Sequence, residues 1–80
     1  MKLYVGNLPY SVDDQRLRAL FGTFGVPASA TVVLDRASGR SKGYGFVEMS
    51  DEDARKAIAA LNQSQLDGRT IWVNEARAKS

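Results

Sequence analysis

The stretch Lys42-Gly43-Tyr44-Gly45-Phe46-Val47-Glu48-Met49 decides the fold, because as a strand it can face the core in only one way. Alternate residues of a strand point to opposite faces, so Tyr44, Phe46 and Glu48 share one face. Burying Glu48 would leave an unpaired carboxylate in an apolar interior, whereas the residues between carry no such cost. We therefore predict that Glu48 faces water and that Tyr44 and Phe46 face water with it.

Three further segments alternate in the same way, and in each the polar residues assign one face to water. These segments are about residues 2–6, 28–34 and 69–75. Tyr4 is predicted to point outward with its polar neighbour, and Trp72 likewise. The predicted open face then contains the side chains of Lys2, Tyr4, Thr31, Val33, Tyr44, Phe46, Glu48, Thr70, Trp72 and Asn74.

Two segments between these strands have the pattern of amphipathic helices. Residues 17–24 and 54–61 each carry apolar side chains at i, i+3, i+4 and i+7. Ser11 and Ser50 are predicted N-caps, and Asn62 can end the second helix in a left-handed conformation. Two helices with one apolar stripe each can cover only one face of a four-stranded sheet. We predict an α+β two-layer sandwich of the split βαβ, ferredoxin-like type with two helices on one face.

Composition narrows the possible functions. The chain has no Cys and no His, so the commonest nucleophiles, bases and metal ligands are missing. We expect no enzyme activity, no metal and no cofactor. Net charge is only +2, but five of the nine acids lie at predicted helix starts, where they complement the helix dipole. The basic side chains left on the rest of the surface include Arg36, Arg40, Lys42, Arg69, Arg77 and Lys79.

The length of 80 residues indicates one small domain, and an apolar fraction of 44% is ordinary for a globular protein. We expect residues 1–80 to be a small complete chain and a monomer, with a core over about 2–76 and a short basic tail at 77–80. No apolar run approaches the length needed to span a bilayer, and no signal peptide is evident. These features predict a cytoplasmic protein, or a nuclear one in a eukaryote, without a membrane partner.

Aromatic residues from three strands on one open face favour a ligand with flat surfaces, since exposed apolar patches usually mark interaction sites. Unstacked nucleic acid bases fit, because every base has a π-face. Lys2, Arg40 and Lys42 are candidates for phosphate contacts, and Asn74 and Glu48 for reading base edges.

The segments Leu3 to Leu8 and Lys42 to Met49 resemble the paired ribonucleoprotein motifs of the RNA recognition motif (RRM) family. The resemblance spans nearly all of residues 2–76, in the right order and spacing. It implies a βαββαβ fold with a four-stranded antiparallel sheet and the two motif strands adjacent at its centre. The longer motif usually ends in an aromatic residue, and here it ends in Met49, which is expected to point inward.

The resemblance also implies roles for individual residues. Tyr4 and Phe46 should each stack on a base, Tyr44 should pack against a sugar or between sugars, and Lys42 should contact a phosphate. Backbone groups that resemble a base-reading segment belong to Asn74, Glu75 and Ala76.

The sequence leaves three choices open. Single-stranded RNA is the expected partner, and single-stranded DNA is the alternative, because stacking alone does not distinguish the two sugars. A protein-interaction module of the RRM type is the competing function. Trp72 either extends the aromatic surface or is shielded by the C-terminal tail.

Overall fold

The computed structural model describes residues 1–76, so the predicted tail at 77–80 lies outside the described part of the chain. The described elements follow one another in the predicted order, with an extra short hairpin before the last strand. They are β1 (Lys2–Gly6), α1 (Asp14–Gly22), β2 (Ser29–Leu34), β3 (Ser41–Glu48), α2 (Asp51–Leu61), β4 (Gln65–Leu66), β5 (Arg69–Thr70) and β6 (Trp72–Glu75).

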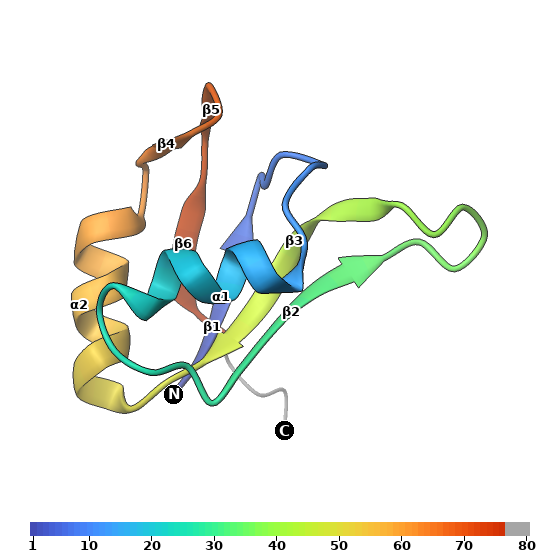
Figure 1. Cartoon of the computed structure of the whole chain (residues 1–80). Coiled ribbons are helices and arrows are strands. Elements are labelled where there is room, and N and C mark those ends of the chain that lie inside the picture. Colours follow the sequence, from blue (N-terminus) through green and yellow to red (C-terminus); the bar gives the residue numbers. More distant parts are fainter. Residues whose placement is uncertain (77–80) are drawn as a thin grey trace.

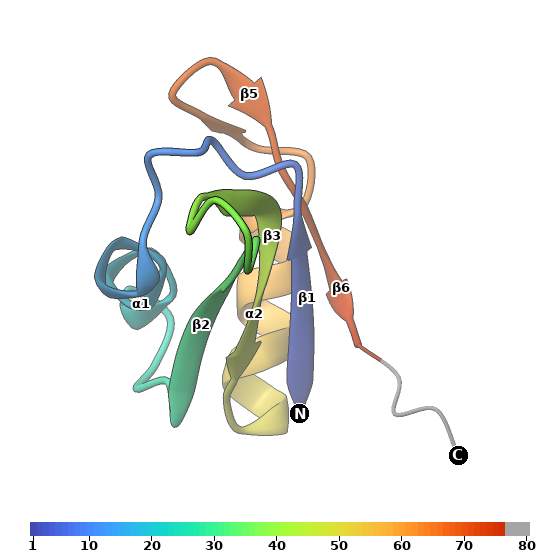
Figure 2. The same ribbon diagram turned by 90° about the vertical axis from the view of Figure 1, so that its right-hand side faces the viewer.

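The sheet has the strand order β2-β3-β1-β6, and each neighbouring pair is antiparallel. The two motif strands, β1 and β3, therefore occupy its centre. Figure 1 shows both helices on one side of this sheet, and Figure 2 shows the four strands side by side in that order. The predicted ferredoxin-like βαββαβ sandwich is confirmed.

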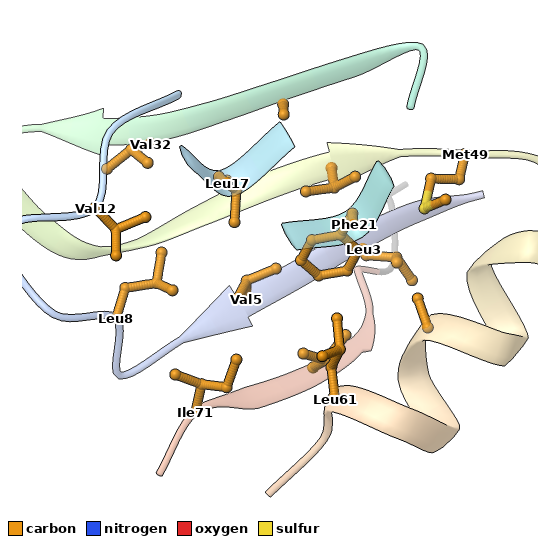
Figure 3. Close-up of a cluster of buried hydrophobic side chains, with 14 of the residues drawn as sticks. Leu3, Val5, Leu8, Val12, Leu17, Phe21, Val32, Met49, Leu61 and Ile71 are labelled. Atoms are coloured by element: carbon orange, nitrogen blue, oxygen red, sulfur yellow. The ribbon is translucent and has the colours of Figure 1, made fainter. Parts of the chain in front are cut away.

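The core lies between the four-stranded sheet and the helices, and each strand of that sheet contributes inward residues to it. Leu3, Val5 and Val47 are completely buried, as are Leu17 and Phe21 on the apolar stripe of α1. Figure 3 shows Leu3, Val5 and Phe21 in one cluster with Leu61 from α2 and with Ile71, which precedes β6. Within residues 1–76 no polar or charged side chain is buried, so this core is held by apolar packing.

The start of α1 differs from the sequence prediction. Asp13, not Ser11, is the N-cap, and its carboxylate accepts the Arg16 N–H at 2.8 Å. The Val12 N–H donates to the Pro9 carbonyl at 3.1 Å, which forms a turn that places Ser11 ahead of the helix. Helix α2 begins as predicted, with the Ser50 hydroxyl accepting the Asp53 N–H at 3.4 Å.

The end of α2 also differs from prediction. Asn62 is extended, with φ −62° and ψ 128°, and the next residue, Gln63, takes the left-handed conformation with φ 64°. The reason is a long-range contact: Asn62 Oδ1 accepts the Val73 N–H at 3.0 Å. This bond ties the end of the helix to β6, which local sequence rules do not foresee.

The strand predicted over residues 69–75 is divided in two. Asp67 and Gly68 have φ of 51° and 83°, the pair of positive angles of a type I′ turn, and they close the small hairpin of β4 and β5. Ile71 then crosses to the main sheet, and its N–H donates to the Ser64 carbonyl at 2.9 Å. Thr70 therefore belongs to the hairpin, and its predicted place on the open sheet face is wrong.

Candidate nucleic-acid interface

A transverse row of side chains crosses the sheet on the face opposite the helices. The antiparallel register makes Tyr4 the partner of Phe46 on β3 and of Asn74 on β6, and makes Phe46 the partner of Thr31 on β2. Lys2 and Glu48 are partners in the adjacent row and are both exposed. The sequence argument assigned these residues to one face through the polar side chains of each strand, and their placement agrees with it.

Tyr4, Tyr44 and Phe46 form a single ring cluster at the centre of this face. The Tyr4 ring lies 5.8 Å from the Tyr44 ring and 5.9 Å from the Phe46 ring, and the latter two are 6.1 Å apart. Their planes meet at 32°, 64° and 89°, the tilted and edge-on arrangements that aromatic quadrupoles prefer. Each ring is only partly buried, so mutual packing orients the rings while part of each surface stays accessible.

Gly6 supports this arrangement, and sequence reasoning did not identify it. Gly6 lies between Tyr44 and Trp72 in the register, on the open face. A Cβ there would approach Tyr4 Cε2 to 2.8 Å and Tyr4 Oη to 2.9 Å, so the Tyr4 ring lies over the glycine backbone. Strand alternation could have identified it, because Gly6 lies two residues after Tyr4 and therefore on the same face of the sheet.

The charged side chains predicted to contact phosphate fall into two places. Lys2 Nζ lies 4.8 Å from the centre of the Phe46 ring, a cation–π contact, and Lys42 lines a hollow beside Tyr4 and Tyr44. Arg40 lies in the loop of the projecting β2–β3 hairpin (Figure 1) and lines a different hollow, near the start of α1. The structure therefore brings Lys2 and Lys42 to the rings and leaves Arg40 apart from them.

The loop carrying Arg40 is ordered by its own backbone contacts. The Asp35 carboxylate accepts the Ala37 N–H at 2.7 Å and the Ser38 N–H at 3.3 Å, and these bonds lower the pKa of Asp35 below its usual value. The Asp35 N–H in turn donates to the Arg40 carbonyl at 2.7 Å. This bonding gives the tip of the hairpin a defined shape that presents Arg40 to solvent.

The C-terminal candidates are placed differently from one another. Asn74 is exposed in the row with Tyr4, but Glu75 pairs with the buried Leu3, so its side chain has the helix-side parity. The Ala76 N–H donates to the Lys2 carbonyl at 2.8 Å and is therefore used by the sheet. Trp72 is 52% exposed on the open face. The alternative, that the C-terminal tail shields it, concerns residues outside the described part of the chain.

Residues 1–76 contain neither a metal-binding group of side chains nor a helix suited to a membrane. Within 1–76, His, Cys, Asp and Glu side chains form no group of three or more that is suited to holding a metal ion. In the same range, neither helix has the length and apolar character required to cross a membrane. The candidate interface is thus made of aromatic rings, cations and polar side chains.

Known proteins resemble this chain along almost its whole length. The family model for the RNA recognition motif matches residues 3–72. A 28 kDa chloroplastic ribonucleoprotein of Nicotiana sylvestris is 52% identical over 79 residues, 98% of this chain, although the chain spans only 29% of that relative's length. The crystal structure of RNA-binding protein PG1 is 47% identical with a TM-score of 0.92, covering 100% of this chain and 98% of the other. The Rna15 RRM with bound GU RNA is 29% identical with a TM-score of 0.86, covering 96% and 83%.

These relatives contradict one prediction. Four of them, from Nicotiana sylvestris, Spinacia oleracea and Arabidopsis thaliana, are named as chloroplastic, so the predicted cytoplasmic or nuclear location is wrong. The prediction depended on the lack of a long apolar run and of a recognisable signal peptide in these 80 residues. None of those features distinguishes the cytosol from the interior of an organelle.

The fold, the paired motif strands and the comparisons agree with one another. The family expected from the two motifs is confirmed by a model match over residues 3–72. The Rna15 RRM, a solved structure of the same fold, has bound GU RNA. The chain belongs to the RNA recognition motif family.

Proposed function

We propose that this chain binds a segment of two to four nucleotides of single-stranded RNA on the open face of its sheet. Tyr4 and Phe46 each stack on a base, and Tyr44 packs against a sugar. The observation that carries this assignment is the single cluster of three rings, with centres 5.8–6.1 Å apart, on the face opposite the helices. The RNA-bound Rna15 RRM, which has the same fold, supports single-stranded RNA as the ligand.

Lys42 and Lys2 supply the phosphate contacts nearest the rings. Lys2 Nζ lies over the Phe46 ring at 4.8 Å, so a base that stacks on that side displaces the ammonium group. A phosphate beside the stacked base gives the displaced charge a new partner, which limits the cost of breaking the cation–π contact. Arg40, in the projecting loop, binds only a strand that extends past the sheet edge.

The remaining candidates define the edges of the interface. Glu48 and Asn74 are exposed on the open face and can accept from or donate to base edges. Trp72 extends the aromatic surface on β6, since it is 52% exposed there. For the C-terminal segment we assign only backbone carbonyls, because the Ala76 N–H is already bonded and the Glu75 side chain has the other parity.

Binding, without catalysis, is the whole activity that we assign to these residues. The sequence has no His and no Cys to act as base or nucleophile. We further propose that residues 2–76 act as one monomeric domain. The pairing of β1 with β6 supports this unit, since it joins the first and last described strands in one sheet.

The test is a titration of short RNA into the wild-type chain and two ring variants. Phe46→Ala and Tyr4→Ala should each weaken binding by about 1–3 kcal/mol while circular dichroism shows a folded domain, because each removes one stacking surface. Val26→Ala is the control, since Val26 is 87% exposed and lies in the loop between α1 and β2. Unchanged affinity in both ring variants would refute the proposed site.

Salt and sugar chemistry separate the competing ligands. With about three phosphate contacts, log affinity should fall with log salt with a slope of about −2. A flat response would instead indicate a peptide ligand. DNA of the same sequence should bind more weakly if contacts to the 2′-hydroxyl contribute, and equal affinity would make DNA an equivalent partner.

A further inference from the structure

A hollow of about 270 Å³ lies beside the ring cluster, where β1 ends and the chain turns toward α1. Three of its aromatic walls come from the sheet, namely Tyr4, Tyr44 and Trp72. Its volume is slightly below the roughly 300–1,000 Å³ of sites for drug-sized ligands, which suits a single base. Its other side-chain walls are Lys42 from β3 and, from the loop and the small hairpin, residues that include Asn7, Tyr10 and Arg69.

Arg69 is held at this hollow by two contacts. Its Nη2 donates to Asn7 Oδ1 at 2.8 Å, and its guanidinium carbon lies 5.8 Å from the centre of the Tyr10 ring. Asn7 is itself fixed, with a left-handed φ of 58° and an Nδ2–H that donates to the Thr70 carbonyl at 2.6 Å. The guanidinium is thus positioned before any ligand arrives.

Arg16, in the same region, differs from Arg69 because its charge is neutralised by a carboxylate within the protein. Arg16 forms a bidentate ion pair with Asp67, with distances of 2.7 and 2.8 Å, which fastens the hairpin to α1. Arg69 has no carboxylate within salt-bridge distance among the described residues. Its hydrogen bond goes to a neutral amide, so its positive charge remains available to an anionic or acceptor-rich ligand.

The aromatic walls provide the complementary flat surfaces. Tyr44 and Trp72 are register partners of Gly6 on either side of β1, so two interstrand spacings, about 9–10 Å, separate their backbones. The Tyr4 ring lies over Gly6 between them. A base entering the hollow therefore meets these rings on one side and the Arg69 guanidinium at its rim.

We propose that this hollow is a separate subsite for one further nucleotide, next to the pair stacked on Tyr4 and Phe46. The proposal rests on the proposed RNA-binding function and adds Arg69, Tyr10 and Asn7 to it. The guanidinium fork matches two adjacent acceptors, which a nucleotide offers either as phosphate oxygens or as O6 and N7 of guanine. Trp72 supplies the stacking surface, because it is the most exposed ring of the hollow's sheet wall.

The test compares a dinucleotide with trinucleotides extended at either end, titrated into the chain and followed by backbone amide shifts. For the wild type, the third nucleotide should raise affinity by about tenfold, the gain expected for one more stacked base. Arg69→Gln and, separately, Trp72→Leu should remove most of that gain. Arg55→Gln, an exposed arginine on α2, is the matched control and should keep it.

Three further arms assign the contact. Loss of the gain for guanine alone assigns Arg69 to the base edge, and equal loss for all four bases assigns it to phosphate. Arg69→Lys, which keeps the charge without the fork, should restore the phosphate contact but not the guanine contact. A trinucleotide with an abasic third position should lose the part of the affinity gain that comes from stacking on Trp72. If it keeps the full gain, the assignment of stacking to Trp72 is overturned.

Failure of this subsite is distinguishable from failure of the proposed function. If the wild type binds the dinucleotide, and Phe46→Ala weakens that binding, the central site stands. If the Arg69 and Trp72 variants then retain the full gain from the third nucleotide, the subsite is refuted. Thermal melting of each variant checks that losing the Asn7 contact does not unfold the hairpin.

Discussion

The two faces of the central sheet are made by the same strands and differ in almost every property. On β1, Val5 is fully buried and contacts the helices, while its neighbour Tyr4 is partly exposed on the opposite side. One face is apolar and covered, and the other is aromatic, charged and open. Stability should therefore depend on one residue set and ligand binding on the other, even though the two sets alternate along each strand.

The largest effect should come from placing a charge on the covered face. Val5→Asp would bury a carboxylate among completely buried apolar side chains, so we expect a loss of more than about 4 kcal/mol and an unfolded chain. Thr31→Asp puts the same charge on the open face beside Phe46 and should cost less than about 1 kcal/mol. Urea unfolding followed by circular dichroism compares them. A folded Val5→Asp variant would contradict the assignment of faces.

A smaller loss of stability is expected from adding one methyl group to the covered face. A Cβ on Gly45 would lie 2.6 Å from the Thr31 carbonyl oxygen and 3.1 Å from Leu17 Cδ2, so Gly45→Ala should cost about 1–3 kcal/mol. Gly22→Ala is the matched control. Its Cβ would meet nothing within 4 Å, and it should stabilise α1 by up to about 1 kcal/mol. Unfolding free energies measured on both variants should therefore differ in sign.

The same addition on the open face should change binding more than stability. Gly6→Ala places its Cβ against the Tyr4 ring, which can move into solvent, so we expect a stability loss of less than about 1 kcal/mol. Moving that ring should weaken RNA binding severalfold, because it disturbs a stacking surface. RNA titration and thermal melting of this variant measure the two effects separately. A large loss of stability with unchanged affinity would contradict the assignment of binding to the open face.

The smallest expected effect concerns acid and the hairpin on the rim. The hydrogen bond and charge of Arg16 lower the pKa of Asp67 below its usual value of 3.8. A carboxyl whose pKa is lower in the folded state stabilises the fold above that usual value, and this contribution is lost as pH falls through the lowered pKa. Asp67→Asn should therefore flatten the stability profile slightly at acidic pH. The pair is exposed, so a steep change in denaturation midpoint would contradict this account.

Much of this division could be predicted from the sequence, because one charged residue resolves the orientation of each central strand and neutral polar residues resolve the outer two. Glu48 and Lys2 assigned the rings to the open face, and the observed register places them there. The stripe of α1 was equally readable, since Leu17 and Phe21 are both buried. Strand alternation and helical periodicity are local, which is why local sequence carries them.

The features that could not be predicted depend on contacts between distant parts of the chain. Ser11 follows the capping rules, but the turn from Pro9 leaves the cap to Asp13. Asn62 stays extended because its side chain bonds to Val73. The hollow at the end of β1 depends on Arg69 meeting Asn7, residues 62 positions apart. The spacing of residues along the chain does not predict which distant residues form such contacts.

The position of Lys2 over Phe46 has a consequence for the chain when it carries no ligand. An uncovered aromatic surface invites a second copy to pack against it, and self-association of that kind leads to aggregation. A hydrated ammonium group held above the ring opposes such packing, since a second copy would have to desolvate it. We therefore expect Lys2 to oppose self-association of this face when no ligand covers it.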